Sequence, residues 1–150
     1  MASVRETILL NLETALDGIR NSLNYESQIK AVSRYDENVL LTENFPNPII
    51  MIVDIGDDEK RVQDSTDYRF RMTIALRGFV KVANAQAVQT ELNKIVSTIR
   101  KFIDAGVSLG SNVLDYRFMN NEQHRYDQEK GLADCVINTR ISYWCSNGSF

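Results

Sequence analysis

The sequence Tyr68-Arg-Phe-Arg-Met-Thr-Ile-Ala-Leu-Arg-Gly-Phe-Val-Lys-Val82 carries the clearest pattern in the chain. Every second side chain from Tyr68 is apolar except at Gly78, and most of the side chains between them are basic or small. This alternation is typical of a β-strand with one buried face. An unbroken strand of fifteen residues would span roughly 50 Å, against about 17–20 Å for an ordinary strand. We therefore expect part of it to project as an arm, or the strand to bend at Gly78.

The segment before this strand has a different pattern. Ile49-Ile-Met-Ile-Val53 is apolar at every position and follows Pro46 and Pro48, which stop strand pairing. A continuous apolar run is typical of a strand that is covered on both faces. We expect one more strand upstream, within 28–35, where the alternation is weak, and a polar loop from Asp36 to Asn47.

Two amphipathic helices are predicted on either side of these strands. Ser3 and Glu6 have capping-box spacing, and a helix is expected from Ser3 to Ser22. Asn84 can cap a second helix that ends near Gly106. Apolar residues recur at helical spacing in both segments, at Val4, Ile8, Leu12, Leu16, Ile19 and Leu23 in the first and at Val88, Leu92, Ile95, Ile99 and Phe102 in the second.

Alternating residues predict two closing strands, at 114–118 and 133–145, separated by a polar loop from Asn120 to Gly131. The order is α-β-β-β-α-β-β. Strands grouped between helices favour an α+β fold, here an about five-stranded, mostly antiparallel sheet with two amphipathic helices packed on one side. The length of 150 residues is that of a single domain, 1–150.

The composition excludes several classes of protein. Lys and Arg number 17 against 20 Asp and Glu, so the net charge of −3 does not suit a basic nucleic-acid-binding domain. No apolar run approaches the roughly 18 residues of a membrane span, and the N-terminus has no signal-peptide layout, so we expect an intracellular protein. Cys135 and Cys145 lie ten residues apart in one predicted strand, roughly 33 Å. They are expected to be buried free thiols.

Motifs that carry catalysis, nucleotide binding or metal binding are absent from the sequence. His124 is the one histidine, and a solvated role in a loop is expected for it. The acidic group Asp54, Asp57, Asp58 and Glu59 lacks the glycine and glutamate spacing of a calcium loop, so it is interpreted as a solvated hairpin tip. We expect no metal, no cofactor and no enzymatic activity. The alternative is a small α+β enzyme or ligand-binding domain whose site joins Asp54, Glu59, Arg71 and His124.

Charge is unevenly distributed around the long strand. Asp54 to Asp67 contains six acidic and two basic residues, a local charge of −4. The outer face of the strand that follows carries Arg69, Arg71, Arg77 and Lys81. One interpretation is that charge protects an exposed sheet from pairing. The other is a head-to-tail subunit interface in a ring, with the candidate residues Asp57, Asp58, Glu59, Arg69, Arg71 and Arg77.

Bases and aromatic residues also mix at 117–126, in the manner of a surface that binds single-stranded nucleic acid. Arg117, His124, Arg125 and Tyr126 lie there. The acidic residues nearby cancel that charge, and these are Asp115, Glu122, Asp127 and Glu129. We therefore expect no nucleic-acid affinity at this segment.

The order of elements resembles the tail terminator proteins of tailed bacteriophages, also called minor tail or tail completion proteins. The most telling part is Asn44-Phe-Pro-Asn-Pro-Ile-Ile-Met-Ile52 followed by the acidic turn Asp54-Ile-Gly-Asp-Asp-Glu59. The resemblance covers nearly the whole chain in order and size. The family is held together by architecture, so the interface residues above come from the charge pattern.

The resemblance implies a structural virion protein of the tail and neck, assembled in the host cytoplasm. Such a protein forms a hexameric ring that caps the tail tube, ends tube polymerisation and provides the head-tail joining surface. Its partners would be itself, the tail tube protein, the connector or neck proteins and, in some tails, the sheath protein. DNA would pass through the lumen without sequence-specific binding. Another neck or head-completion protein would share these features.

Overall fold

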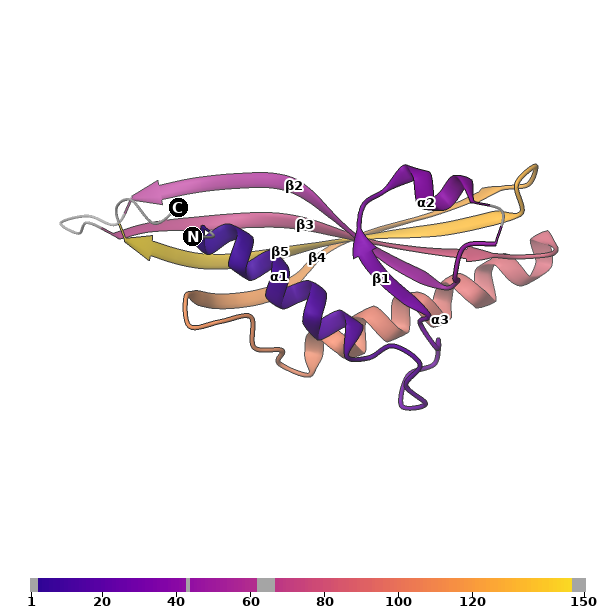
Figure 1. The fold of residues 1–150 in the computed structure, drawn as a ribbon, viewed down its shortest axis with the longest axis horizontal. Helices are drawn as coiled ribbons and strands as arrows, with labels where there is room; N and C mark the ends of the chain where they lie inside the picture. The colour runs from indigo at the N-terminus through magenta and orange to yellow at the C-terminus, as the bar shows by residue number, and fades with distance from the viewer. Residues whose placement is uncertain (1–2, 43, 62–66, 147–150) are drawn as a thin grey trace.

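The computed structural model describes residues 3–42, 44–61 and 67–146. Within them the chain forms α1 (Val4–Asp17), β1 (Ala31–Arg34), α2 (Glu37–Leu41), β2 (Ile49–Arg61), β3 (Asp67–Lys81), α3 (Ala85–Asp104), β4 (Val113–Asp127) and β5 (Leu132–Ser146). Figure 1 shows these strands joined in one sheet with helices on its faces. The predicted α+β class and the order of its strands and two long helices are confirmed.

The sheet has five strands among the described residues, in the spatial order β1-β2-β3-β5-β4. β1 is parallel to β2, and all other neighbouring strands are antiparallel. β3 therefore lies in the middle, between β2 and β5. β2, β3 and β5 continue together well beyond the short β1, toward the end of the sheet where the N-terminus of α1 lies (Figure 1).

The main core lies between one face of the sheet and the two long helices. The alternate apolar residues of β3 point into it, and α1 and α3 supply the opposing layer. Ser3 caps α1 by accepting a hydrogen bond from the Glu6 amide, and Asn84 caps α3 by accepting one from the Ala87 amide. The prediction of two amphipathic helices on one side of the sheet is confirmed.

A second, smaller core covers the opposite face at the β1 end of the sheet. It contains Phe45, Ile49, Met51 and Phe79, and Val39 and Leu40 of α2 pack against it. The prediction that the apolar part of β2 is buried on both faces is confirmed. The predicted polar loop from Asp36 to Asn47 was wrong in part, because Asp36 caps the short helix α2 and its apolar side covers this face.

The long strand stays paired through Gly78, and β2, β3 and β5 run on together past β1 (Figure 1). We call this part of the sheet the arm, and it consists of 53–61 of β2, 67–75 of β3 and 138–146 of β5. Gly78 pairs in register with Ile50 on one side and with Cys135 on the other. A Cβ atom built on Gly78 would lie 2.4 Å from Cγ2 of Ile95 and 3.2 Å from Sγ of Cys135. Gly78 is therefore needed because α3 approaches the sheet backbone closely at this point.

Three boundaries differ from the sequence prediction. β2 continues to Arg61, so the acidic segment is strand and not a hairpin tip, because its backbone pairs with β3 whatever its side chains are. β4 continues to Asp127 through most of the predicted loop after Asn120, because an edge strand with one exposed face needs few apolar residues. α1 ends at Asp17 instead of Ser22, because its C-cap is Gly18, a poor helix former, and Leu23 is 83% exposed.

We predict that Gly78→Ala destabilises the protein by about 1–3 kcal/mol, as overpacking does. The added methyl group would meet Ile95, whereas Gly→Ala in an unobstructed strand is stabilising. Urea unfolding of Gly78→Ala, Ile95→Ala and the double variant measures the coupling. The loss caused by Gly78→Ala should be smaller when Ile95 is alanine. Equal losses in both backgrounds would contradict this explanation.

Candidate interaction surface

A β-bulge divides the acidic segment of β2 between the two faces of the sheet. The register shifts between Asp54 and Gly56, so that Asp54 lies opposite Ile74 and Asp57 lies opposite Met72. Residues three apart in a regular strand point to opposite faces, but the extra residue brings both of these carboxylates to the helix face. Asp58 lies opposite Arg71 and points to the other face.

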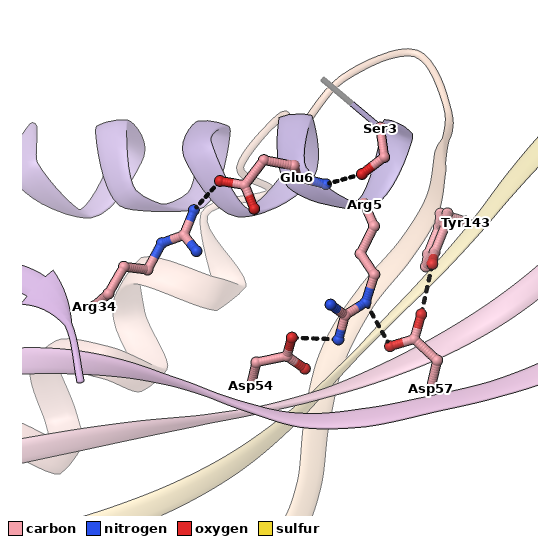
Figure 2. A network of polar contacts seen from close by, with 7 residues as sticks. All are labelled: Ser3, Arg5, Glu6, Arg34, Asp54, Asp57 and Tyr143. Atoms are coloured by element: carbon pink, nitrogen blue, oxygen red, sulfur yellow. Dashed lines mark hydrogen bonds and ion pairs between the residues drawn. The ribbon is translucent and has the colours of Figure 1, made fainter. Parts of the chain in front are cut away.

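Arg5 of α1 binds both carboxylates on the helix face, as Figure 2 shows. Its Nε donates to Oδ1 of Asp57 over 2.9 Å, and its terminal nitrogen forms an ion pair with Asp54. The hydroxyl of Tyr143 on β5 donates to Oδ2 of Asp57 over 2.6 Å. This network joins the first turn of α1 to two strands of the arm.

Burial and charge set the protonation of this network. Burial raises the pKa of the Tyr143 phenol, and the hydrogen bond to Asp57 raises it further. Burial alone would lower the pKa of Arg5, but the hydrogen bond and charge of Asp57 and the charge of Asp54 outweigh it, so that the pKa is raised. Both groups are therefore held in the protonated form that donates to Asp57.

A second arginine joins α1 to the edge strand. Arg34 of β1 donates to Oε1 of Glu6 over 3.0 Å and to Oε2 of Glu13 over 3.1 Å (Figure 2 shows the Glu6 contact). The two glutamates lie seven residues apart, about two turns, so they share one side of the helix. Arg5 and Arg34 therefore attach α1 to the sheet through polar contacts that flank the apolar face of the helix.

The opposite face of the arm carries the predicted basic residues. Arg71 forms an exposed ion pair of 3.8 Å with Asp58, and Arg69 is exposed. Arg77 is instead held within the chain, because it binds Asp134 at 3.0 Å and its guanidinium lies over the rings of Phe79, at 4.8 Å, and Tyr35, at 5.5 Å.

The six candidate interface residues therefore fall into groups. Asp58, Arg69 and Arg71 are exposed on the outer face of the arm, whereas Asp57 and Arg77 have partners inside their own chain. Glu59 pairs through its backbone with Phe70, and its side chain lies outside the described part of the structure. Their role between subunits stays a prediction.

The residues of the alternative enzymatic site are not brought together where they are described. Asp54 contacts Arg5 and Arg71 contacts Asp58, while His124 on β4 contacts Glu122 and Gln89, both at 3.2 Å. β2 and β4 are separated in the sheet by β3 and β5. Within residues 3–42, 44–61 and 67–146 no group of three or more His, Cys, Asp or Glu side chains is placed to hold a metal ion.

Cys135 and Cys145 are both buried and form no disulfide among the described residues, as the sequence predicted. Burial raises the pKa of the Cys135 thiol to about 12, so the thiol is protonated at neutral pH and is a poor nucleophile. Among the helices that the structure describes, none is long and apolar enough to cross a membrane.

Sequence reasoning did not find Arg5 or Tyr143. One signal was available for Arg5, because a basic residue in the first turn of a helix opposes the helix dipole and therefore calls for an acidic partner elsewhere. The partner could not be identified, since the bulge that turns Asp57 toward α1 has no clear mark in the sequence beyond Gly56. Gly56 adopts φ 143°, a conformation that favours glycine.

No protein-family model matches the sequence. A search of the curated proteins also finds no match. Among solved structures, the chain is similar to a chain from the virion of a native gene transfer agent particle, with a TM-score of 0.48 and 11% sequence identity. The alignment covers 95% of this chain and 92% of that chain. At this score and identity the similarity carries no argument about function.

We predict that Asp→Asn substitutions at three neighbouring positions lower the free energy of unfolding by different amounts. Their side chains are 19% exposed at Asp57, 31% at Asp54 and 75% at Asp58. Asp57→Asn should cost about 1–2 kcal/mol because asparagine offers Arg5 and Tyr143 only one acceptor oxygen and no negative charge. Asp54→Asn should cost less than about 1 kcal/mol, and the control Asp58→Asn should stay within about 0.5 kcal/mol. Urea unfolding at neutral pH measures all three, and equal losses would contradict the network.

We also predict that stability falls as pH rises above about 9. Cys135, Tyr143 and Tyr116 all have raised pKa values in the folded protein, chiefly because they are buried. The unfolded chain releases these protons first, so folding loses free energy as pH rises between the unfolded and folded values. Cys135→Ala should reduce the slope of stability against pH by about 1.4 kcal/mol per pH unit above pH ~9. Parallel curves for the two proteins would contradict this assignment.

Proposed function

We propose that this chain is a structural component of a tailed-phage virion, a tail terminator that acts as a ring and not as an enzyme. The ring would cap the tail tube at full length, end tube polymerisation and provide the surface on which the head connector docks. DNA would pass through its lumen without sequence-specific contacts. The partners are further copies of the chain, the tube protein and the connector or neck proteins, with the sheath protein in a contractile tail.

The order of elements carries this proposal. An amphipathic helix, a short strand, an apolar strand after Asn47-Pro48, an acidic continuation, a long alternating strand, a second helix and two closing strands follow one another as the family resemblance implies. The structure has this order, with the short helix α2 added before β2.

The arm of the sheet supports a role in assembly. β2, β3 and β5 extend past β1, and on this part of the sheet the outer face carries charged side chains and no helix among the described residues. Arg5 and Tyr143 hold the other face to α1 through Asp57. A rigid arm with one free face suits contact between neighbouring subunits. We place Asp58, Arg69 and Arg71 in that contact, while Asp57 and Arg77 support it from within.

The basic side chains on this face are better placed against protein than against DNA. A lumen lined by arginine would attract the phosphate backbone and slow the passage of DNA. Arg71 also has an acidic neighbour, Asp58, on the same face. A mixed charge pattern suits a protein partner, because each sign can meet its opposite across an interface.

Negative-stain electron microscopy of the purified protein tests this proposal, together with its mass by sedimentation at high concentration. We expect rings, or monomers that form rings on the ends of added tail tubes. A protein that stays monomeric at every concentration and never binds a tube end would contradict the proposal. Cross-linking chiefly to head proteins, with no tube protein, would instead indicate a neck or head-completion protein.

A further inference from the structure

Four arginines lie on the uncovered outer face of the sheet, and we call this group the arginine face. Arg69 and Arg71 come from β3, Arg140 from β5 and Arg117 from β4. Thr73 on β3 lies opposite Arg140, and Arg140 lies directly opposite Arg117. The group therefore crosses three neighbouring strands, beyond the part of this face that α2 covers.

The charges of the arginine face are poorly balanced within the chain. Like charges directly opposite each other on antiparallel strands destabilise the pairing, and Arg117 and Arg140 occupy such positions. Nε of Arg140 is buried without a hydrogen-bond partner among the described residues. The acids nearby form only exposed contacts, Asp115 with Arg117 at 3.3 Å and Asp58 with Arg71 at 3.8 Å. Among the described residues, the four arginines therefore outnumber the acids that contact them on this face.

Apolar side chains accompany these arginines. Trp144 lies opposite Arg69 in the strand register, Val53 lies opposite Ala75, and both Trp144 and Val53 are only half-buried. Arginine and tryptophan are enriched at the energetic centres of protein interfaces. The composition is thus that of a binding surface for protein.

The chain also exposes a surface of the opposite character at α2. Asp36 and Glu37 are exposed at the start of the helix, Leu41 at its end is 67% exposed, and Tyr35 is exposed beside them. No Lys or Arg occurs anywhere from residue 35 to residue 59. We call these four residues the α2 surface. Val39 and Leu40 hold it to its own sheet, so it cannot reach the arginine face of its own chain by a local shift.

We propose that the α2 surface of one copy docks on the arginine face of the next copy. The carboxylates of Asp36 and Glu37 would then meet Arg71, Arg117 and Arg140, and Leu41 would pack near Trp144. The two surfaces differ, so the contact is heterologous and can close into a ring. This inference rests on the proposed ring, and names the two surfaces that join its subunits.

A second copy fits this face better than DNA does. Asp58 and Asp115 lie among the arginines and would repel a phosphate backbone. The same acids can accept hydrogen bonds from a protein. In each chain α2 covers only the β1 end of the outer face, so a neighbouring α2 would cover the remaining part.

Two double variants test the contact, each altering one surface. Arg71→Glu with Arg117→Glu reverses the arginine face, and both side chains are more than half exposed, at 54% and 65%. Asp36→Asn with Glu37→Lys reverses the α2 surface and keeps a good helix cap, since asparagine caps as well as aspartate. Lys130→Glu and Glu129→Lys in the β4–β5 turn are controls that change the charge in the same direction as each double variant. Thermal melting confirms that each variant is folded.

Sedimentation velocity of the variants gives the decisive result. Each double variant alone should self-associate at least about tenfold more weakly than wild type, and the two controls should match wild type. An equimolar mixture of the two double variants should associate more strongly than either variant alone, because at both contacts between them a basic surface meets an acidic one. High salt should weaken this association.

Other outcomes would overturn the inference. If both double variants still form wild-type rings, the rings are joined elsewhere, and the proposed function stands without this contact. If wild type forms no rings and caps no tube ends, the proposed function falls first. A third outcome would show that the arginine face binds nucleic acid instead. In that case wild type binds a 30-base-pair DNA duplex at about physiological salt, and Arg71→Glu with Arg117→Glu abolishes this binding while leaving assembly intact.

Discussion

β3 is covered on both faces along part of its length and on one face along the rest, and the other elements of the structure depend on this constraint. At Ala75–Phe79 the strand is covered on both faces, by α3 on one side and by Phe45 and Met51 beneath α2 on the other. Closer to Asp67 only the α1 side is covered. Gly78 makes the first arrangement possible, because any larger residue would collide with Ile95. The change from two covered faces to one creates the arm.

The β-bulge in β2 lies where β2, like β3, passes from two covered faces to one. Before the bulge, alternate apolar residues of β2 serve two cores, and beyond it Asp57 replaces an apolar residue on the helix face. A carboxylate there would be costly without partners, and Arg5 and Tyr143 supply them. Polar contacts therefore continue the attachment of α1 where the apolar core ends.

The distribution of charge links this architecture to the proposed function. The small net charge of −3 conceals an acidic stretch and a basic face. Part of the acidic stretch is satisfied within the chain, through Arg5. Two further surfaces of opposite sign are exposed, the acidic α2 surface and the arginine face. Such a division is expected of a subunit that binds its own copies head to tail, as we propose for this chain.

Periodicity was enough to predict the two long helices, the long strand and the buried apolar part of β2. Each of these depends on which side chains a regular element presents to one face, and this follows from local order along the chain. The ten-residue separation of Cys135 and Cys145 along one strand also predicted that they are buried without bridging each other. The short helix α2 and the polar second half of β4 were missed, because a five-residue helix and an edge strand bury too little for a periodic signal.

Partners across the fold required the three-dimensional arrangement. The sequence places Arg5 and Asp57 fifty-two residues apart, and a single bulged residue decides whether Asp57 faces α1 or the outer face. The pairing of β4 with β5 places Arg117 opposite Arg140, and this could not be predicted from the sequence. A strand pattern reports the face of each residue, but register and bulges depend on the whole sheet. Element types therefore followed from local chemistry, whereas the polar network and the arginine face arose from the packing of distant segments.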